Sequence, residues 1–290
     1  DSLSVMEVRN ELDVRIAEKM FKFSLLGEPR KDCWNLVLCN EFHMTNDSHL
    51  FKTEPGNGRL PLYEGKMMHQ FTHTWGDAKY WINEAEARKL LLDKLSLDSK
   101  QLLDYQHYRL GFREIASNTN ERGMIATILP KNVFANHKLM LSDFSRGSIS
   151  NCQLLYVVAI LNSFSFDLLV RQRTTTTISM FTFYQLPVPR LTEKDKAFRP
   201  IVERAAKLIC TTPEFDDLAM EAGIGSHKQG ATDPVVRARL RAELDGLVAH
   251  LYGLTEEEFA YILTTFPLVK DPVKIAAQNA YRDVERGLIK

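Results

Sequence analysis

Residues 108–131 read YRLGFREIASNTNERGMIATILPK, and the two halves of this stretch have opposite characters. The first half, up to residue 122, is rich in arginine, asparagine and short hydroxyl side chains. The second half contains the apolar run Met124–Leu129 closed by a proline, a pattern that predicts a buried strand. Arginine matches phosphate oxygens and guanine edges, and asparagine matches adenine edges. The stretch therefore predicts polar donors at the mouth of a rigid strand, or alternatively a solvated loop whose arginines pair with Glu114 and Glu121.

The charge of the chain is balanced overall but uneven along its length. With 290 residues, 44% hydrophobic and 26% charged, the composition is typical of a globular protein of one large or two ordinary domains. A net charge of zero argues against a polyanion binder that uses its whole surface. Between Lys100 and Arg190, however, ten basic residues face only five acidic ones. We therefore expect a nucleic-acid-binding face in the central third.

The sequence predicts neither a membrane span nor a secretion signal. No apolar run reaches about eighteen residues, and the N-terminal residues are polar and acidic. The cysteines are too scattered for a zinc site and are expected to be reduced small hydrophobic residues. They are Cys33, Cys39, Cys152 and Cys210. We therefore expect a cytoplasmic protein, and a chain that begins at Asp1 rather than methionine is typical of a piece of a longer one.

Periodicity divides the chain into three parts and predicts an α+β fold. Residues 1–30 have helical apolar spacing and form a lead-in from a preceding domain. Residues 31–190 mix strand and helix patterns and are expected to form a mixed-sheet domain. Residues 191–290 form a helical C-terminal region. Its helices are expected at Lys194–Cys210, Pro234–Tyr252, Glu256–Thr264 and Asp271–Arg286.

Within the middle part, further patterns predict individual elements. Trp34–Leu38 is expected to be a strand, and Gln153–Val170, apolar nearly all round, a single buried helix. Thr174–Thr177 favours a strand of branched side chains, the alternative being a row of hydroxyls on phosphates. Tyr184–Pro189, with prolines at alternate positions, predicts an extended edge or strap.

Five blocks of sequence carry a family resemblance. They are PLYEGKMMHQF, RLGFREIASNTNERGMIATILPK, LLYVVAILNSFSFDLLVRQR, YQLPVP and RARLRAELDGLVAHLYGLTEEEFAYILTTFP, in this order. Together they resemble the C-terminal target-recognition region of type IIG restriction-modification enzymes. The exit LPVPRLTEKDKAFRPIVERAAKL is similar to the end of a recognition domain in type I specificity subunits.

The resemblance implies a domain that binds double-stranded DNA and positions an adenine methyltransferase over one target base. The methyltransferase, with or without a nuclease domain, would be the N-terminal part of the same parent chain in a bacterium or archaeon. That parent would use S-adenosylmethionine and Mg²⁺. This chain has neither the glycine-rich turn nor the Asn-Pro-Pro-aromatic loop of such a methyltransferase, so we expect it to hold no cofactor and no catalytic residue.

The matching blocks nominate a set of DNA-binding residues without separating base contacts from phosphate contacts. The set is Lys66, His69, Gln70, Arg109, Arg113, Asn118, Asn120, Arg122, Lys131, Arg171, Gln172 and Arg173.

Two alternatives from other functional classes stay open. Asp47, Glu64 and Lys66 have the Asp…Glu-x-Lys order of a Mg²⁺-dependent nuclease, although so short a pattern also arises by chance. A protein-interaction module that docks through its helical tail is the second alternative. His69 and His73 have the spacing of a zinc-binding helix, but Gln70 stands where the catalytic glutamate belongs, and no metal site is predicted.

Overall fold

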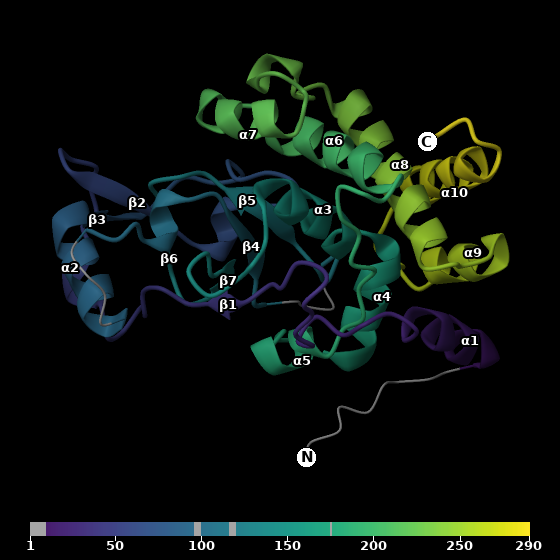
Figure 1. The fold of residues 1–290 in the computed structure, drawn as a ribbon, viewed down its shortest axis with the longest axis horizontal. Helices are drawn as coiled ribbons and strands as arrows, with labels where there is room; N and C mark the ends of the chain where they lie inside the picture. The colour runs from purple at the N-terminus through teal and green to yellow at the C-terminus, as the bar shows by residue number, and fades with distance from the viewer. Residues whose placement is uncertain (1–9, 96–99, 116–119, 175) are drawn as a thin grey trace.

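The computed structural model describes residues 10–95, 100–115, 120–174 and 176–290 and shows an α+β protein (Figure 1). This confirms the predicted fold class. The strands are β1 (Leu38–Cys39), β2 (Arg59–Tyr63), β3 (Tyr80–Asn83), β4 (Arg109–Arg113), β5 (Ala126–Leu129), β6 (Phe134–Ala135) and β7 (Leu139–Ser142). The helices are α1 (Glu11–Met20), α2 (Glu84–Leu95), α3 (Asn151–Leu161), α4 (Phe164–Arg173), α5 (Met180–Tyr184), α6 (Phe198–Ile209), α7 (Asp216–Glu221), α8 (Pro234–Leu251), α9 (Glu256–Thr264) and α10 (Asp271–Glu285).

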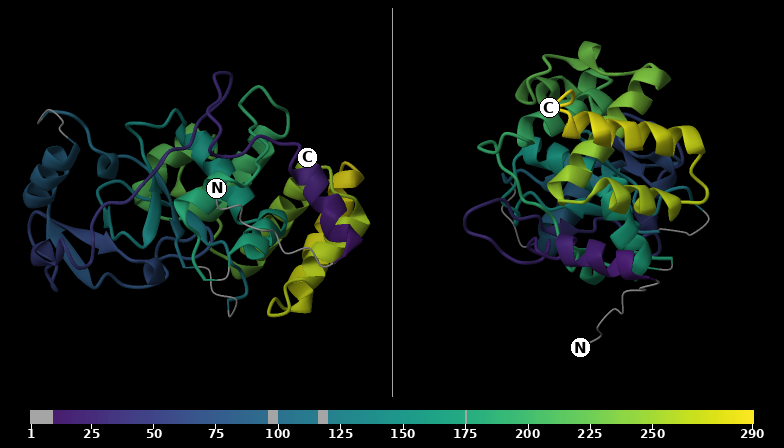
Figure 2. Two further views of the ribbon diagram at one scale, coloured as in Figure 1. Left: turned by 90° about the horizontal axis from the view of Figure 1, so that it is seen from below. Right: turned by 90° about the vertical axis from the view of Figure 1, so that its right-hand side faces the viewer.

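Two small sheets form the β part of the molecule. The first has the order β1-β7-β4-β5 with antiparallel neighbours. The second has the order β3-β2-β6, in which β2 runs antiparallel to β3 and parallel to β6. The second sheet and α2 lie at one end of the molecule, and α1, α9 and α10 lie at the other (Figure 1), an arrangement that Figure 2 shows from below.

The stretch that opens the sequence forms the centre of the first sheet. The apolar run becomes β5, as predicted, and it pairs with β4 in the register Arg109↔Leu129 to Phe112↔Ala126. The polar lead-in was expected to stand at the mouth of a strand, but its residues Arg109–Arg113 form the largely buried strand β4. Arg109, the first residue of β4, lies in the protein interior, where its charge needs a counter-charge, and Glu41 provides it.

The predicted single helix Gln153–Val170 is wrong, because α3 and α4 meet at an angle of 67°. Ser163 caps α4 by accepting a hydrogen bond from the Phe166 amide, and the Asn162 side chain binds both backbone groups of Ala126 on β5. No single described helix is long and apolar enough to cross a bilayer. This bent pair reaches that length only together, and its apolar side chains are buried in the protein.

The helical region packs directly on the first sheet. Helix α3 contacts β4 and β5 on one side and α6 and α8 on another, and α8 packs along α10. At that crossing Gly246 is required, since a Cβ there would lie 2.8 Å from the backbone of Ala280. One hydrophobic core therefore extends from the sheet into the C-terminal helices, across position 190 where we predict a domain boundary.

Of the remaining predicted elements, the C-terminal helices are confirmed and two strands are not formed as predicted. Helices α6, α8, α9 and α10 confirm the four predicted in the C-terminal region. The strand predicted at Trp34–Leu38 is not formed: within this range Asn35 makes an isolated bridge, and the two-residue strand β1 begins only at Leu38. The strand predicted at Thr174–Thr177 is also absent from the described residues: Thr174 caps α4, Thr177 forms an isolated bridge, and residue 175 lies outside them. Tyr184 ends α5, and the strap after it pairs with residues 24–27 as an extended segment.

Candidate nucleic-acid interface

A tight loop between β2 and β3, which we call the 66–76 loop (Lys66–Gly76), gathers several predicted residues. The amide of His69 donates to the Thr72 carbonyl at 2.8 Å, and the amide of Trp75 donates to the Met67 carbonyl at 2.9 Å. Phe71 anchors the loop to β5 through its amide and the Ala126 carbonyl, 3.0 Å apart. Phe71 has a φ of 59°, which is rare for so bulky a residue. The loop is therefore closed by its own backbone and fixed to the first sheet.

Four arginines, here called the arginine cluster (Arg113, Arg122, Arg237 and Arg241), surround this loop. Arg113 donates to the Met68 carbonyl, Arg241 Nη2 to Gln70 Oε1 at 2.6 Å, and Arg237 Nη2 to Thr72 Oγ1 at 2.9 Å. Arg122 joins through the Asn162 carbonyl, which accepts from Arg122 Nη2 at 2.6 Å and from Gln70 Nε2 at 3.4 Å. Strand β4 and helix α8 thus bring their arginines to one loop.

The positive charge of the cluster is only partly neutralised. Arg122 forms an ion pair with Asp167, its Nε lying 2.9 Å from Oδ2. Arg113, Arg237 and Arg241 form no ion pair with a carboxylate of the described residues; their hydrogen-bond partners are neutral. Burial lowers the pKa of Arg113 and of Arg237, and lowers that of Arg241 to about 10, with Arg122 adding to the effect. These groups stay cationic at neutral pH and would be stabilised by an anion.

The positive charges of the arginine cluster also lower the pKa of His69. Burial, followed by the charges of Arg241, Arg113 and Arg122, lowers the pKa of His69 to about 4. Its imidazole is therefore neutral at pH 7, and its ring lies 4.5 Å from the ring of Trp75.

The structure brings seven predicted residues into this region. Lys66, His69 and Gln70 belong to the loop, and Arg113 and Arg122 to the cluster. Asn120 and Arg171 lie next to them, because the Asn120 carbonyl accepts from Arg171 Nη2 at 3.0 Å and Arg122 and Arg171 both lie over the Phe266 ring.

Three of the residues predicted to contact DNA are buried in the protein, which corrects the prediction for them. Arg109 has no exposed surface; it pairs with Glu41 at 2.5 Å and donates to the Val133 carbonyl at 2.6 Å. Arg122 and Gln70 are buried as well, and their polar groups bind Asp167, Met124 and Asn162 inside the protein. These residues support the loop and the strand rather than reach a duplex.

Three more predicted residues lie elsewhere. Gln172 Nε2 is 3.4 Å from Asp13 Oδ1 on α1, and Arg173 lies over the Phe21 ring, so both point toward the N-terminal segment. Lys131 forms an ion pair with Asp217 of α7 at 2.7 Å. Asn118 lies outside the described residues.

Sequence reasoning missed Arg237, Arg241 and Trp75. The two arginines occur four residues apart in the RARLR motif, a spacing that places both on one face of a helix, but the motif does not indicate what that face contacts. Trp75 follows the matched block by four residues and had no motif to mark it.

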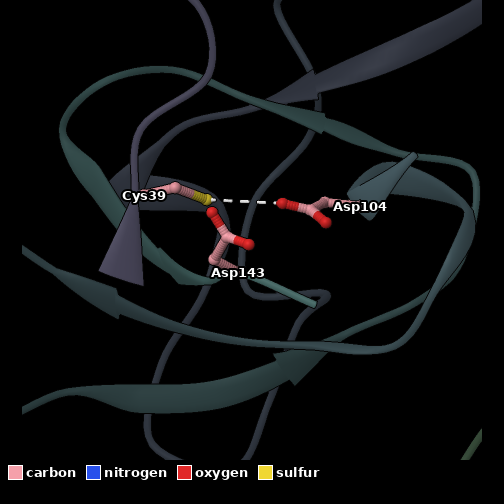
Figure 3. A group of neighbouring side chains, drawn as sticks. All are labelled: Cys39, Asp104 and Asp143. Carbon is pink, nitrogen blue, oxygen red and sulfur yellow. Dashed lines mark hydrogen bonds between the residues drawn. The ribbon is translucent and has the colours of Figure 1, made fainter. Parts of the chain in front are cut away.

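Cys39, Asp104 and Asp143 form a cluster whose potential ligand atoms all lie within 4.8 Å of one another (Figure 3). The thiol lies 3.8 Å from Asp104 Oδ2, and burial raises the pKa of the Cys39 thiol well above its usual value and raises that of Asp104. Asp143 is already bound by Arg146, whose Nε lies 2.6 Å from Oδ2. A protonated thiol beside a guanidinium does not favour a cation, so we assign this cluster to the packing of the turn after β7.

The residues of the alternative nuclease site have separate partners. Asp47 pairs with Lys94 of α2 at 3.2 Å, whereas Glu64 pairs with Lys66 at 3.0 Å. In the part of the chain that the structure describes, no contact joins Asp47 to Glu64, and neither belongs to a group of three potential metal ligands.

Comparisons with known proteins give little further guidance. No family model matches the sequence, and no curated protein does. Among solved structures, the chain is similar to the Type IIL restriction-modification enzyme MmeI in complex with DNA, with a TM-score of 0.42 and 10% sequence identity. The match covers 92% of this chain and 37% of the MmeI chain. The likeness to a restriction-modification enzyme is therefore distant, and this chain spans little more than a third of that one.

Proposed function

We propose that this chain is the DNA target-recognition part of a restriction-modification enzyme. The observation that carries the proposal is the set of three guanidinium groups around the 66–76 loop, those of Arg113, Arg237 and Arg241, that have no carboxylate partner among the described residues. Half-buried guanidinium groups that form no ion pair suit phosphate oxygens, which arginine binds in a forked geometry. The sequence blocks that resemble type IIG recognition regions contain all three arginines and support the same function.

In the proposed complex, the loop acts as a fixed platform on the duplex. Lys66, whose side chain is exposed, and Arg113 neutralise phosphates and set the register of the protein on the DNA. Arg171 shares the Phe266 ring with Arg122 and binds the Asn120 carbonyl. Asn120 and Arg171 are our candidates for base contacts, because amide and guanidinium groups match adenine and guanine edges. Backbone closure of the loop limits the entropy lost when it binds.

The chemistry belongs, in this proposal, to another part of the parent protein. The residues present here do not fit S-adenosylmethionine, since the sequence lacks both the glycine-rich turn and the Asn-Pro-Pro-aromatic loop. We propose a type IIG parent in the cytoplasm of a bacterium or archaeon. Its N-terminal part would bind S-adenosylmethionine and Mg²⁺ and methylate adenine.

Duplex binding by the 290-residue chain tests the function. We expect it to bind a fluorescent mixed-sequence duplex at about 50 mM salt and to lose affinity steeply toward about 200 mM, as phosphate contacts release counterions. Selection from a random duplex pool would then give the recognised site. Failure to bind any duplex at low salt would contradict the proposal and favour a protein-interaction module.

A further inference from the structure

Trp75 is the most exposed of the three tryptophans. Its side chain is 62% exposed, whereas Trp34 is buried and Trp81 is half-buried in β3. Single exposed apolar residues are common on proteins, so exposure alone indicates nothing. What distinguishes Trp75 is that one side of its ring is supported by His69, at a centroid distance of 4.5 Å and an interplanar angle of 32°.

The backbone that presents Trp75 is rigid and strained. Its amide is held by the Met67 carbonyl at 2.9 Å, and a Cβ on the following Gly76 would lie 3.0 Å from the Lys66 carbonyl oxygen. Phe71, within the same loop, adopts a φ of 59°. Such strain costs on the order of 1–3 kcal/mol and is concentrated at functional sites.

The 66–76 loop and the residues next to it carry charges of both signs. Lys66 begins the loop and Lys79 follows Trp75 by four residues, both with exposed side chains, and Arg113 donates to the Met68 carbonyl of the loop. Asp77 is exposed on the same loop, and Glu64 is paired with Lys66. A neutral aromatic pair beside exposed ammonium groups is the arrangement on which unstacked nucleobases bind.

We propose that Trp75, supported by His69, stacks on a nucleobase that has left the helical stack of bound DNA. This inference rests on the proposed function and adds that the site prefers DNA with an unstacked base. His69 is a positioning residue, because it acts through the indole. Lys66 and Arg113 would hold the phosphates on either side of the displaced nucleotide.

The experiment compares two probes, a mixed-sequence duplex and the same duplex with a single-base bulge. An unpaired base has already lost its stacking, so we expect the wild-type chain to bind the bulged duplex about ten-fold more tightly. Trp75→Ala should remove this preference, and Trp75→Phe should keep most of it. Phe144→Ala is the matched control. Like Trp75, Phe144 is an exposed aromatic (52%) stacked on a histidine, with its ring centroid 3.6 Å from that of His107, but its neighbour in the sequence is the acidic Asp143. It should leave both affinities unchanged.

Fluorescence gives an independent measurement. The difference in emission between wild type and Trp75→Phe isolates Trp75, and its quenching by acrylamide should fall when the bulged duplex binds. Unaltered thermal unfolding of Trp75→Ala would show that the fold is intact.

Each contrary result has a distinct meaning. If the wild type binds duplex but Trp75→Ala keeps the preference for the bulge, or if bound DNA leaves Trp75 open to acrylamide, the stacking inference is overturned while the proposed function stands. Equal loss of affinity for both probes would also overturn it, because Trp75 would then be an ordinary duplex contact. Absence of any duplex binding would overturn both.

Discussion

Arg109 and Arg113 stand at the two ends of β4 and show how environment decides the role of a residue. Arg109 is completely buried and is neutralised by Glu41, so its charge serves the fold. Arg113 is half-buried and binds only the neutral Met68 carbonyl among the described residues. Its charge remains available to a ligand.

Replacement of Arg113 by alanine should weaken duplex binding and lower the slope of log affinity against log salt by about one. Fluorescence anisotropy over a series of salt concentrations measures this slope. Arg199→Ala is the control, since Arg199 is exposed on α6 and paired with Glu203. An unchanged slope for Arg113→Ala would remove Arg113 from the phosphate contacts.

Replacement of Arg109 by alanine should instead destabilise the fold. It would leave the Glu41 carboxylate buried without its partner, at a cost of about 3–5 kcal/mol in the free energy of unfolding. Urea unfolding measures the loss, and Arg199→Ala should cost less than about 1 kcal/mol in the same assay. If Arg109→Ala lowered the free energy of unfolding no more than Arg199→Ala does, Arg109 would not stabilise the fold by neutralising Glu41.

At the scale of elements, the junction between α3 and α4 fixes both helices to the sheet. Asn162 donates to the Ala126 carbonyl at 2.9 Å and accepts from the Ala126 amide at 3.0 Å, completing the edge of β5. The same residue offers its own carbonyl to Arg122. The bend therefore links the strand edge to the arginine cluster.

Asn162→Ala should leave the buried Ala126 amide without a partner, whereas the Ala126 carbonyl keeps its bond from the Phe71 amide. We expect the free energy of unfolding to fall by about 1–3 kcal/mol. Chemical denaturation of the variant provides the measurement. Asn151→Ala is the matched control, because Asn151 makes an exposed hydrogen bond to Glu221 at the start of α3. A loss no larger than that of Asn151→Ala would contradict the role of Asn162.

The elements that the sequence predicted are those whose pattern is local. Strand β5 and helices α8, α9 and α10 follow from apolar runs and helical spacing. Strand β4 was missed because Arg109 makes it look polar, and its partner Glu41 lies 68 positions away in the chain. The break at Asn162 was missed for the same reason, since the groups that stabilise it belong to β5. Of the candidate site, the sequence nominates Lys66, His69, Gln70 and Arg113 as single residues, but the loop they form or contact and the contributions of α8 depend on tertiary contacts.

At the scale of the whole molecule, the docking of the C-terminal helices involves a buried acid. Asp245 of α8 accepts the Phe164 amide of α4 at 2.8 Å. Burial raises the pKa of Asp245 to about 6, although Arg122 and Arg241 oppose this effect and Asp167 adds to it. The folded state therefore binds a proton more tightly than the unfolded state, and the contribution of Asp245 to stability falls as pH rises from about 4 to about 6.

Asp245→Asn keeps a carbonyl oxygen for the Phe164 amide and cannot ionise. Relative to wild type, we expect its free energy of unfolding to increase by about 2 kcal/mol between pH 4 and pH 7. The comparison is necessary because His69, whose pKa is lowered, changes the wild-type stability in the opposite direction over this range. Urea unfolding at the two pH values measures the difference, and a constant difference would contradict a raised pKa.

The hydrogen bonds that Arg237 and Arg241 donate to the 66–76 loop have a consequence for moving this loop into another protein. A transplanted loop would arrive without the two side chains that hold Gln70 and Thr72, and they come from a helix more than 160 positions downstream. A chimera that moves the loop alone should therefore lose the geometry it was meant to import. One that carries α8 along with the loop should keep these hydrogen bonds and the loop conformation.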